Sequence, residues 1–195
     1  MEKEQQSFEN KIDWSPLKSG GASFKTHKLV EKSSQRVEYK ASVGSILFGG
    51  LFALVGSGIT IAFFVLGASF FLLLFGLVFE GVGVFVLKQA LTPIVFDKSE
   101  GYFWKGRKSP HQVSDISEIK VAAKIDDIYG IQVIKEYVRS TSDKGRDTSY
   151  YSYEINLILS SGERLNVVDY GNANAILQDA SKLSKFLGKP IVTQN

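Results

Sequence analysis

The chain has 195 residues, with 23 lysines and arginines against 20 aspartates and glutamates, and it contains no cysteine. A net charge of +3, without a basic stripe interleaved with aromatics, argues against a nucleic-acid partner. The lack of cysteine excludes thiol catalysis, thiolate metal sites and disulfide bonds.

The first 40 residues are polar and divide into a tail and a short β segment. Residues 1–21 show no hydrophobic periodicity, which predicts a flexible tail. Trp14 could dock on the folded part, although a loosely attached aromatic is the simpler interpretation. Residues 22–40 contain two β-rich runs around a serine turn, which predicts a β-hairpin leading into the membrane. His27 has no cluster of ligand residues nearby, which favours a surface strand residue over a metal ligand.

An apolar stretch over residues 41–87 dominates the sequence, with Glu80 as its single charge. A helix rises ~1.5 Å per residue and a bilayer core is ~30 Å thick, so one crossing takes about 20 residues. The stretch therefore predicts two transmembrane helices, over residues 43–65 and 70–87, with a tight turn at residues 66–69. We assign residues 41–91 to this membrane hairpin.

Lysine and arginine positions predict the orientation of the hairpin. Eight of these residues precede it, fifteen follow it, and the connecting turn has none. By the positive-inside rule both termini should lie in the cytoplasm, with only the turn facing outward. We therefore expect a multi-pass protein of the inner membrane.

Small residues recur along one face of each predicted helix. Such stripes let two helix backbones approach closely, so we expect the two faces to meet. The stripes comprise Ser45, Gly49, Ala53 and Ser57 in the first helix, and Ser69, Gly76, Gly83 and Ala90 in the second.

Glu80 shares the face of Gly76 and Gly83 and lies eight residues from Lys88, or ~12 Å deep. A charged carboxylate at that depth costs ~2.5–3.5 kcal/mol on insertion scales. We expect Glu80 to be neutral, or bonded to Ser57, to a backbone carbonyl or to a second copy of the protein.

The pattern changes to β after residue 91. We expect a polar loop over residues 140–149, a bulge near Lys135, and a final helix capped by Asn172 or Asn174 and ended by Gly188. Its apolar stripe comprises Ile176, Leu177, Ala180, Leu183 and Leu187. The six predicted strands cover residues 93–97, 101–105, 119–125, 131–138, 151–159 and 164–168. Residues 92–195 are thus predicted to form an α+β domain, a bent antiparallel sheet or split barrel with one C-terminal helix.

This order of elements resembles the pleckstrin-homology-like domains of bacteria, which are often joined to membrane hairpins. The runs PIVFDK and GYFWKG at residues 93–106, and YEINL and GERLN at residues 153–166, carry the likeness. With GGASF at residues 20–24, the chain is similar to a family of uncharacterised bacterial inner-membrane proteins. The resemblance implies this architecture and localisation, and it implies no assigned activity.

The sequence contains no motif that is typical of an enzyme active site. His111 follows a Ser-Pro pair typical of a turn, and Asp126-Asp127 suits a turn between strands better than a metal site. Phosphate-loop and zinc-type spacings are absent from the sequence. We therefore expect neither catalysis nor a metal or other cofactor.

Two groups of residues that contain aromatics are candidate binding sites. Trp104, Lys105, Arg107 and Lys108 could contact anionic lipid headgroups, with ~1 kcal/mol for each cation near the surface. The alternative is a solvated hairpin end with Trp104 in the core. Tyr150, Tyr151 and Tyr153 could line a ligand site, although a stripe of period two is usually core.

The sequence as a whole favours a membrane-anchored binding or assembly module. The hairpin would localise the protein in the lipid bilayer and pair with itself or with another membrane protein. The β domain would present a surface to a lipid or protein partner. The alternative is a transport-associated subunit that uses Glu80 within an oligomer.

Overall fold

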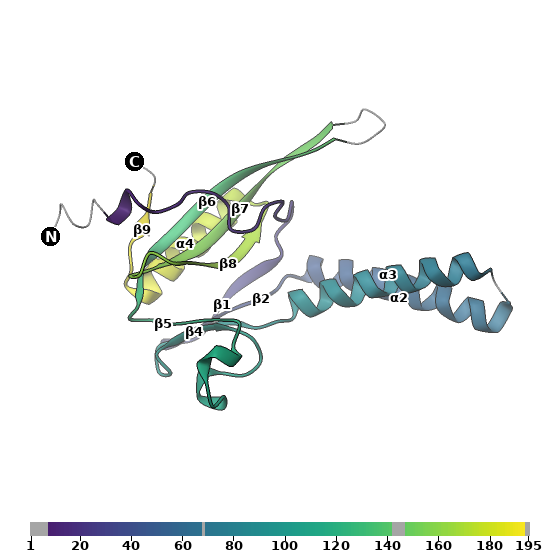
Figure 1. Ribbon diagram of the computed structural model, residues 1–195, viewed down its shortest axis with the longest axis horizontal. Helices are drawn as coiled ribbons and strands as arrows, with labels where there is room; N and C mark the ends of the chain where they lie inside the picture. Colours follow the sequence, from purple (N-terminus) through teal and green to yellow (C-terminus); the bar gives the residue numbers. More distant parts are fainter. Residues whose placement is uncertain (1–7, 68, 142–146, 194–195) are drawn as a thin grey trace.

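The computed structural model describes residues 8–67, 69–141 and 147–193. A helical hairpin projects from a β domain, as Figure 1 shows. Two short 3-10 helices, Pro110–Gln112 and Ile116–Glu118, lie in the connection between the strands that end at Lys105 and begin at Val121. The helices and strands are β1 (His27–Ser33), β2 (Arg36–Ala41), α2 (Val43–Leu66), α3 (Phe70–Ala90), β3 (Ile94–Asp97), β4 (Tyr102–Lys105), β5 (Val121–Lys124), β6 (Ile128–Thr141), β7 (Asp147–Leu159), β8 (Arg164–Tyr170), α4 (Ala173–Leu187) and β9 (Ile191–Val192).

The two apolar helices are confirmed, and each is long and apolar enough to cross a membrane. At ~1.5 Å per residue, the 24 residues of α2 extend about 36 Å and the 21 residues of α3 about 32 Å. The Ser42 hydroxyl accepts from the Ser45 N–H and begins α2, and Gly67 ends α2 in a left-handed conformation. Ala68 of the predicted turn lies outside the described residues.

Glycines bring the two helix backbones into direct contact. A Cβ atom on Gly83 would lie 2.2 Å from the Ala53 backbone nitrogen, and one on Gly56 would lie 2.2 Å from that of Glu80. Ser57, which we predicted to be a contact position, is only partly buried, and Gly56 is buried in its place. The step from Gly49 to Gly56 is seven residues, because closely packed helices meet at an average spacing of 3.5 rather than 4 residues.

The helical hairpin is inserted between two neighbouring strands of one antiparallel sheet. That sheet has the order β1-β2-β3-β4-β5, and β2 pairs with β3 in a register that places Val37 opposite Phe96. Residues 22–40, which the sequence analysis separated from residues 92–195, therefore supply β1 and β2 to the same folded domain. The second sheet has the order β8-β7-β6-β9, with β9 parallel to β6.

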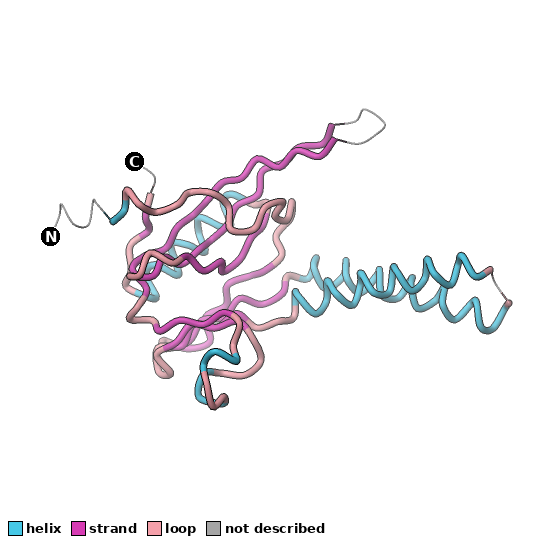
Figure 2. The backbone as a smooth tube through the Cα atoms, viewed as in Figure 1, coloured by secondary structure: helices cyan, strands magenta, loops and turns pink. Residues whose placement is uncertain are grey.

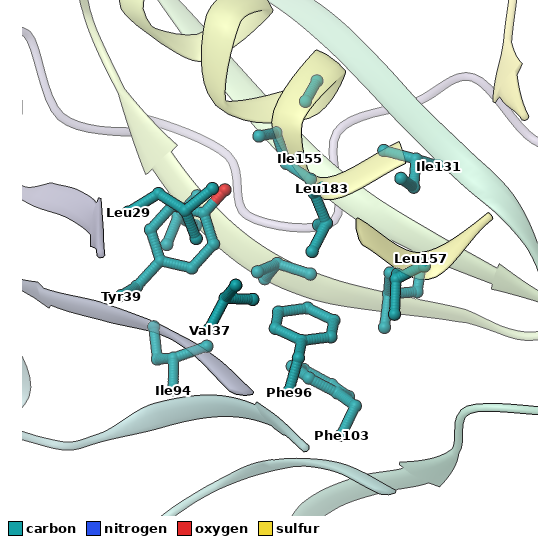
Figure 3. Packing of buried hydrophobic residues seen from close by; sticks show 14 of the residues in the cluster. Leu29, Val37, Tyr39, Ile94, Phe96, Phe103, Ile131, Ile155, Leu157 and Leu183 are labelled. Carbon is teal, nitrogen blue, oxygen red and sulfur yellow. The ribbon is translucent and has the colours of Figure 1, made fainter. Parts of the chain in front are cut away.

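The hydrophobic core lies between the two sheets and is closed by α4 (Figure 3). Phe96 and Phe103 from the first sheet meet Ile155 and Leu157 from the second. The helix begins after Asn172, whose side chain accepts from the Ala175 N–H, and it ends at Gly188. The mainly antiparallel sheets and the helix α4 agree with the predicted α+β class. One member of the predicted helix stripe is wrong, because Leu177 is 55% exposed.

Strands β6 and β7 continue beyond the core as a two-stranded arm, visible at the upper right of Figure 1. The predicted loop over residues 140–149 is therefore too long, and its residues 142–146 lie outside the described residues. The predicted bulge at Lys135 is also wrong, because Lys135 pairs regularly with Tyr153 and the irregularity lies between Ile128 and Gly130. Alternation weakens near Lys135 because the arm leaves the core, and Tyr137 is already 57% exposed.

Residues 8–22, which we call the N-terminal strap, cross the second sheet as a largely irregular segment (Figure 2). They were predicted to be a flexible tail, and residues 1–7 of that tail lie outside the described residues. Ile12 is buried against Ile158 and Val192, and Trp14 packs on this cluster. Polar side chains of the sheet hold the rest of the strap, which the sequence pattern does not reveal. They are Gln132, Glu136, Tyr150, Ser152, Glu154 and Arg164.

Candidate functional site

A cavity of about 270 Å³ lies where the helical hairpin meets the β domain. Its walls come from the strap and the segment that follows it, from both sheets, and from the ends of α2 and α3 that adjoin the domain. The residues that carry its chemistry are Lys18, His27, Ser45, Lys105, Asn166 and Asp169.

Strand register places His27 and Lys105 at the end of the first sheet nearest the helices. His27 pairs with Ala41, the residue before the Ser42 cap of α2. Lys105 pairs with Ile94, which begins β3 shortly after α3 ends. Because side chains alternate along a strand, Lys105 points to the same side of β4 as the core residue Phe103. The interior between the sheets thus changes from apolar core to polar cavity at this end.

The Lys105 ammonium has one hydrogen-bond partner, the side-chain oxygen of Asn166 at 3.2 Å, within the part of the chain that the structure describes. Burial lowers the pKa of Lys105 to about 7, and the nearby charge of Lys18 adds to this effect. The carboxylates of Asp169 and Glu154 oppose the shift without cancelling it. A lysine ammonium has three donors, so this group has unused hydrogen-bonding capacity.

His27 is a neutral side chain of the cavity and not the surface residue we predicted. Its Nδ1 lies 2.9 Å from the Thr26 hydroxyl, which itself donates to the Asp169 carbonyl. The Thr26 hydroxyl therefore accepts from Nδ1–H, and the other ring nitrogen, Nε2, is buried near the backbone of Ala90. Burial, followed by the charge of Lys105, lowers the pKa of His27 to about 4. The sheet end is enclosed by the helices and the strap, which strand alternation alone does not predict.

Hydrogen bonds link the cavity to the strap across the face of the second sheet that the strap covers. Asn166 accepts from Lys105 and donates to the Asn156 side-chain oxygen at 3.2 Å. Asn156 in turn donates to Glu154 at 3.0 Å. The Glu154 carboxylate also accepts from the backbone N–H groups of Leu17 and Lys18, at 3.0 and 2.7 Å. Lys18 lines the cavity, so this polar chain begins and ends at the same site.

The start of β1 is tied directly to the first turn of α2. The Thr26 carbonyl accepts from the Ser45 hydroxyl at 2.7 Å and from the Ser42 N–H at 2.9 Å. Phe24 lies beside Phe48 of α2, with ring centroids 6.1 Å apart. These contacts make the helix base a wall of the cavity rather than a loosely attached anchor.

The predicted lipid-contact cluster is divided by the structure. Trp104 is 2% exposed and carries the Arg36 guanidinium over its ring at 5.5 Å. Arg107 is exposed and borders a second hollow together with Trp104, while Lys108 is exposed to solvent. Only Lys105 of the four lines the cavity, because Trp104 and Lys105 point to opposite sides of β4.

The three tyrosines of β7 also separate. Tyr153 packs against the core, and the Tyr150 hydroxyl donates to the Gly21 carbonyl of the strap. Tyr151 is exposed on the arm, where its ring lies 5.3 Å from that of Tyr137 and beneath the Lys135 ammonium. They therefore do not line a common ligand site.

The residues considered for enzymatic chemistry lie in connections between strands. His111 is exposed in the 3-10 helix after β4, and Asp126 and Asp127 form the turn between β5 and β6. Within residues 8–67, 69–141 and 147–193, no group of three metal-ligating side chains comes together.

Glu80 lies in the middle of α3, ten residues from each end. Its backbone is the part that packs against Gly56 of α2. The side chain is partly exposed and makes no hydrogen bond or ion pair with the residues that the structure describes, so the bond to Ser57, one of the alternatives that we expected, is not formed.

Sequence reasoning missed Lys18, Asn156, Glu154, Asn166 and Asp169 as members of one polar site. Polar residues alternating along β7 and β8 resemble the solvent face of a sheet, and no local signal marks that face as covered. Searches with protein-family models and among curated proteins find no match to this sequence.

Proposed function

We propose that this protein is a membrane-anchored binding module that takes a ligand in the cavity at the base of the hairpin. One observation carries the proposal: the cavity is built jointly by the helix ends, both sheets and the strap. Neither the hairpin nor the domain forms this site alone. A ligand bound there would therefore contact the domain at the surface of the bilayer.

The exposed side chains of the hairpin support a membrane location. Leu54, Phe64 and Phe71 are between 74% and 81% exposed, and such a contiguous apolar surface is unfavourable in water. The pairing of β2 with β3 supports placing both ends of the hairpin on one side of the bilayer. The lysine and arginine distribution favours the cytoplasmic side, and we propose a bacterial inner-membrane protein with both termini in the cytoplasm.

We further propose that the β domain is pleckstrin-homology-like, with the hairpin inserted between its second and third strands. Two antiparallel sheets followed by α4 support this interpretation. Binding rather than catalysis remains the function we expect. The transport-associated role of Glu80 remains an alternative prediction.

Native mass spectrometry of the full-length protein, released from a mild detergent, tests the proposed function. We expect a bound small molecule of discrete mass on the wild type. Ala22→Phe, which adds a ring to the cavity wall, should reduce its occupancy several-fold. Leu177→Phe, at an exposed position of α4, is the matched control and should retain the molecule. A wild type without any adduct, or equal occupancy in both variants, would contradict the proposal.

A further inference from the structure

Cationic side chains outnumber carboxylates among the described residues that line the cavity. Lys18 and Lys105 line it together with one carboxylate among the described residues, that of Asp169. Glu154, the other nearby carboxylate, already accepts from Asn156 and from two backbone N–H groups of the strap. His27 adds no charge, because burial lowers its pKa to about 4. The Lys105 ammonium therefore lies in the cavity with the neutral Asn166 side chain as its one hydrogen-bond partner among the described residues.

The apolar part of the cavity lining comes mainly from α3 and from the segment before β1. Phe85 and Val86 of α3 contribute to it, and Phe24 extends it beside Phe48 of α2. Phe24 and Phe85 are both exposed, at the end of the hairpin that adjoins the domain. In a membrane protein this end lies at the level of the lipid headgroups. The site therefore combines two cationic side chains with exposed apolar side chains at the base of the hairpin.

The size of the cavity suits a headgroup rather than a whole lipid. Its volume of about 270 Å³ lies just below the range of roughly 300–1,000 Å³ found for sites that enclose drug-sized ligands. A polar headgroup fits this space, while acyl chains must remain outside it along the helices.

On the basis of the proposed binding function, we infer that the ligand is a membrane phospholipid. Its phosphate lies between Lys18 and Lys105, and its acyl chains follow Phe24, Phe85 and Val86 into the bilayer. A lipid phosphate supplies the charge-assisted hydrogen bonds that the Lys105 ammonium lacks. The apolar lining favours a lipid over a free phosphate ion, although the two share the same anionic chemistry.

The experiment uses full-length protein that has been stripped of lipid in detergent and then offered defined ligands. The ligands are phosphatidylglycerol, diacylglycerol and inorganic phosphate, and native mass spectrometry measures the bound fraction. We expect phosphatidylglycerol to bind, diacylglycerol to bind at least tenfold more weakly, and inorganic phosphate not to compete.

Charge variants localise the headgroup. Lys105→Met should weaken phosphatidylglycerol binding about tenfold, and Lys105→Arg should retain most of it because it keeps the cation. Lys108→Met, which removes an exposed cation just beyond the same strand, is the matched control and should bind as the wild type does. Circular dichroism and elution volume report whether each variant is folded, and Lys18→Met supplies an independent test from the other side of the cavity.

Each outcome separates the inference from the proposed function. Equal binding of diacylglycerol and phosphatidylglycerol would overturn the phosphate assignment and leave a lipid-binding module. Effective competition by inorganic phosphate would overturn the lipid assignment and leave an anion site. Equal losses in Lys105→Met and Lys108→Met would move the headgroup out of the cavity. Failure of every ligand to bind, together with no adduct on the native protein, would defeat the proposed function itself.

Discussion

Gly83→Ala should loosen the helical hairpin, because the structure leaves no room for a methyl group at this position. A Cβ atom on Gly83 would lie 2.2 Å from the Ala53 nitrogen and 2.7 Å from both the Ala53 Cα and the Gly49 carbonyl oxygen. These are backbone atoms, so no side chain can rotate away. Ordinary contact begins at 3.4 Å, and the helices must therefore separate by about 1.2 Å.

The expected loss of stability follows from that separation. Overpacking at a close contact typically costs about 1–3 kcal/mol. Alanine also improves helix propensity over glycine by up to ~1 kcal/mol, which would partly hide the loss. Gly81→Ala supplies the matched control, since a Cβ atom there meets nothing within 4 Å. The difference between the two variants removes the propensity effect and should be about 1–3 kcal/mol in the free energy of helix separation.

The measurement is denaturation of the full-length protein by sodium dodecyl sulfate in mixed micelles. Fluorophores on Leu54→Cys and Val82→Cys report helix separation by energy transfer, since both positions are exposed and the chain has no native cysteine to label. Gly83→Ala should separate at a lower mole fraction of denaturant than Gly81→Ala. Superimposable curves for the two variants would refute the backbone contact between α2 and α3.

Three further predictions concern the polar cavity, the strap and the Glu80 carboxyl of α3. Burial lowers the pKa of Lys105 to about 7, and the neighbouring titratable groups are Lys18, His27, Asp169 and Glu154. The phosphate of a bound phospholipid should keep the Lys105 ammonium protonated. Affinity should be constant well below pH 7 and fall as the pH rises above it; Lys105→Arg should remove that fall, and a fall that persists in Lys105→Arg would assign it to another group. Glu154→Gln replaces the carboxylate that accepts from two strap N–H groups by an amide, which should cost ~1–3 kcal/mol of stabilisation. Limited proteolysis should therefore cleave the strap faster than in the wild type. The control Glu163→Gln, in an exposed turn, should be cleaved at the wild-type rate. Glu80→Gln should leave expression, oligomer size and any cellular phenotype unchanged, because the backbone of Glu80 and not its carboxyl packs against Gly56; loss of the phenotype alone would favour a proton-exchanging role.

The apolar helices and the core strands are predictable from the sequence because each depends on a local pattern. The two spans follow from length and hydropathy, and Gly76 and Gly83 follow from their spacing on one helix face. Ile155 and Leu157 follow from alternation along a buried strand. Gly56 was missed because a fixed period of four drifts away from the contact line over three turns.

The cavity was not predictable, because its parts are brought together by pairing between distant segments. His27 and Lys105 meet the helix base only through the registers of β1 with β2 and of β3 with β4. Glu154 and Asn156 resemble solvent-facing residues until the strap covers them. Lys105 was chosen from the sequence for its charge, but its neighbours in that choice, Arg107 and Lys108, lie elsewhere.

The position of the hairpin between β2 and β3 also sets the order in which a nascent chain can mature. Synthesis delivers β1 and β2 first, and β2 must wait through the 52 residues 42–93 before its neighbour β3 exists. If only one of the two helices crossed the bilayer, β2 and β3 would end on opposite sides and the first sheet could not close. With the hairpin in a membrane, as we propose, completion of the domain requires both crossings, and a chain with one crossing would keep an open strand edge at β2.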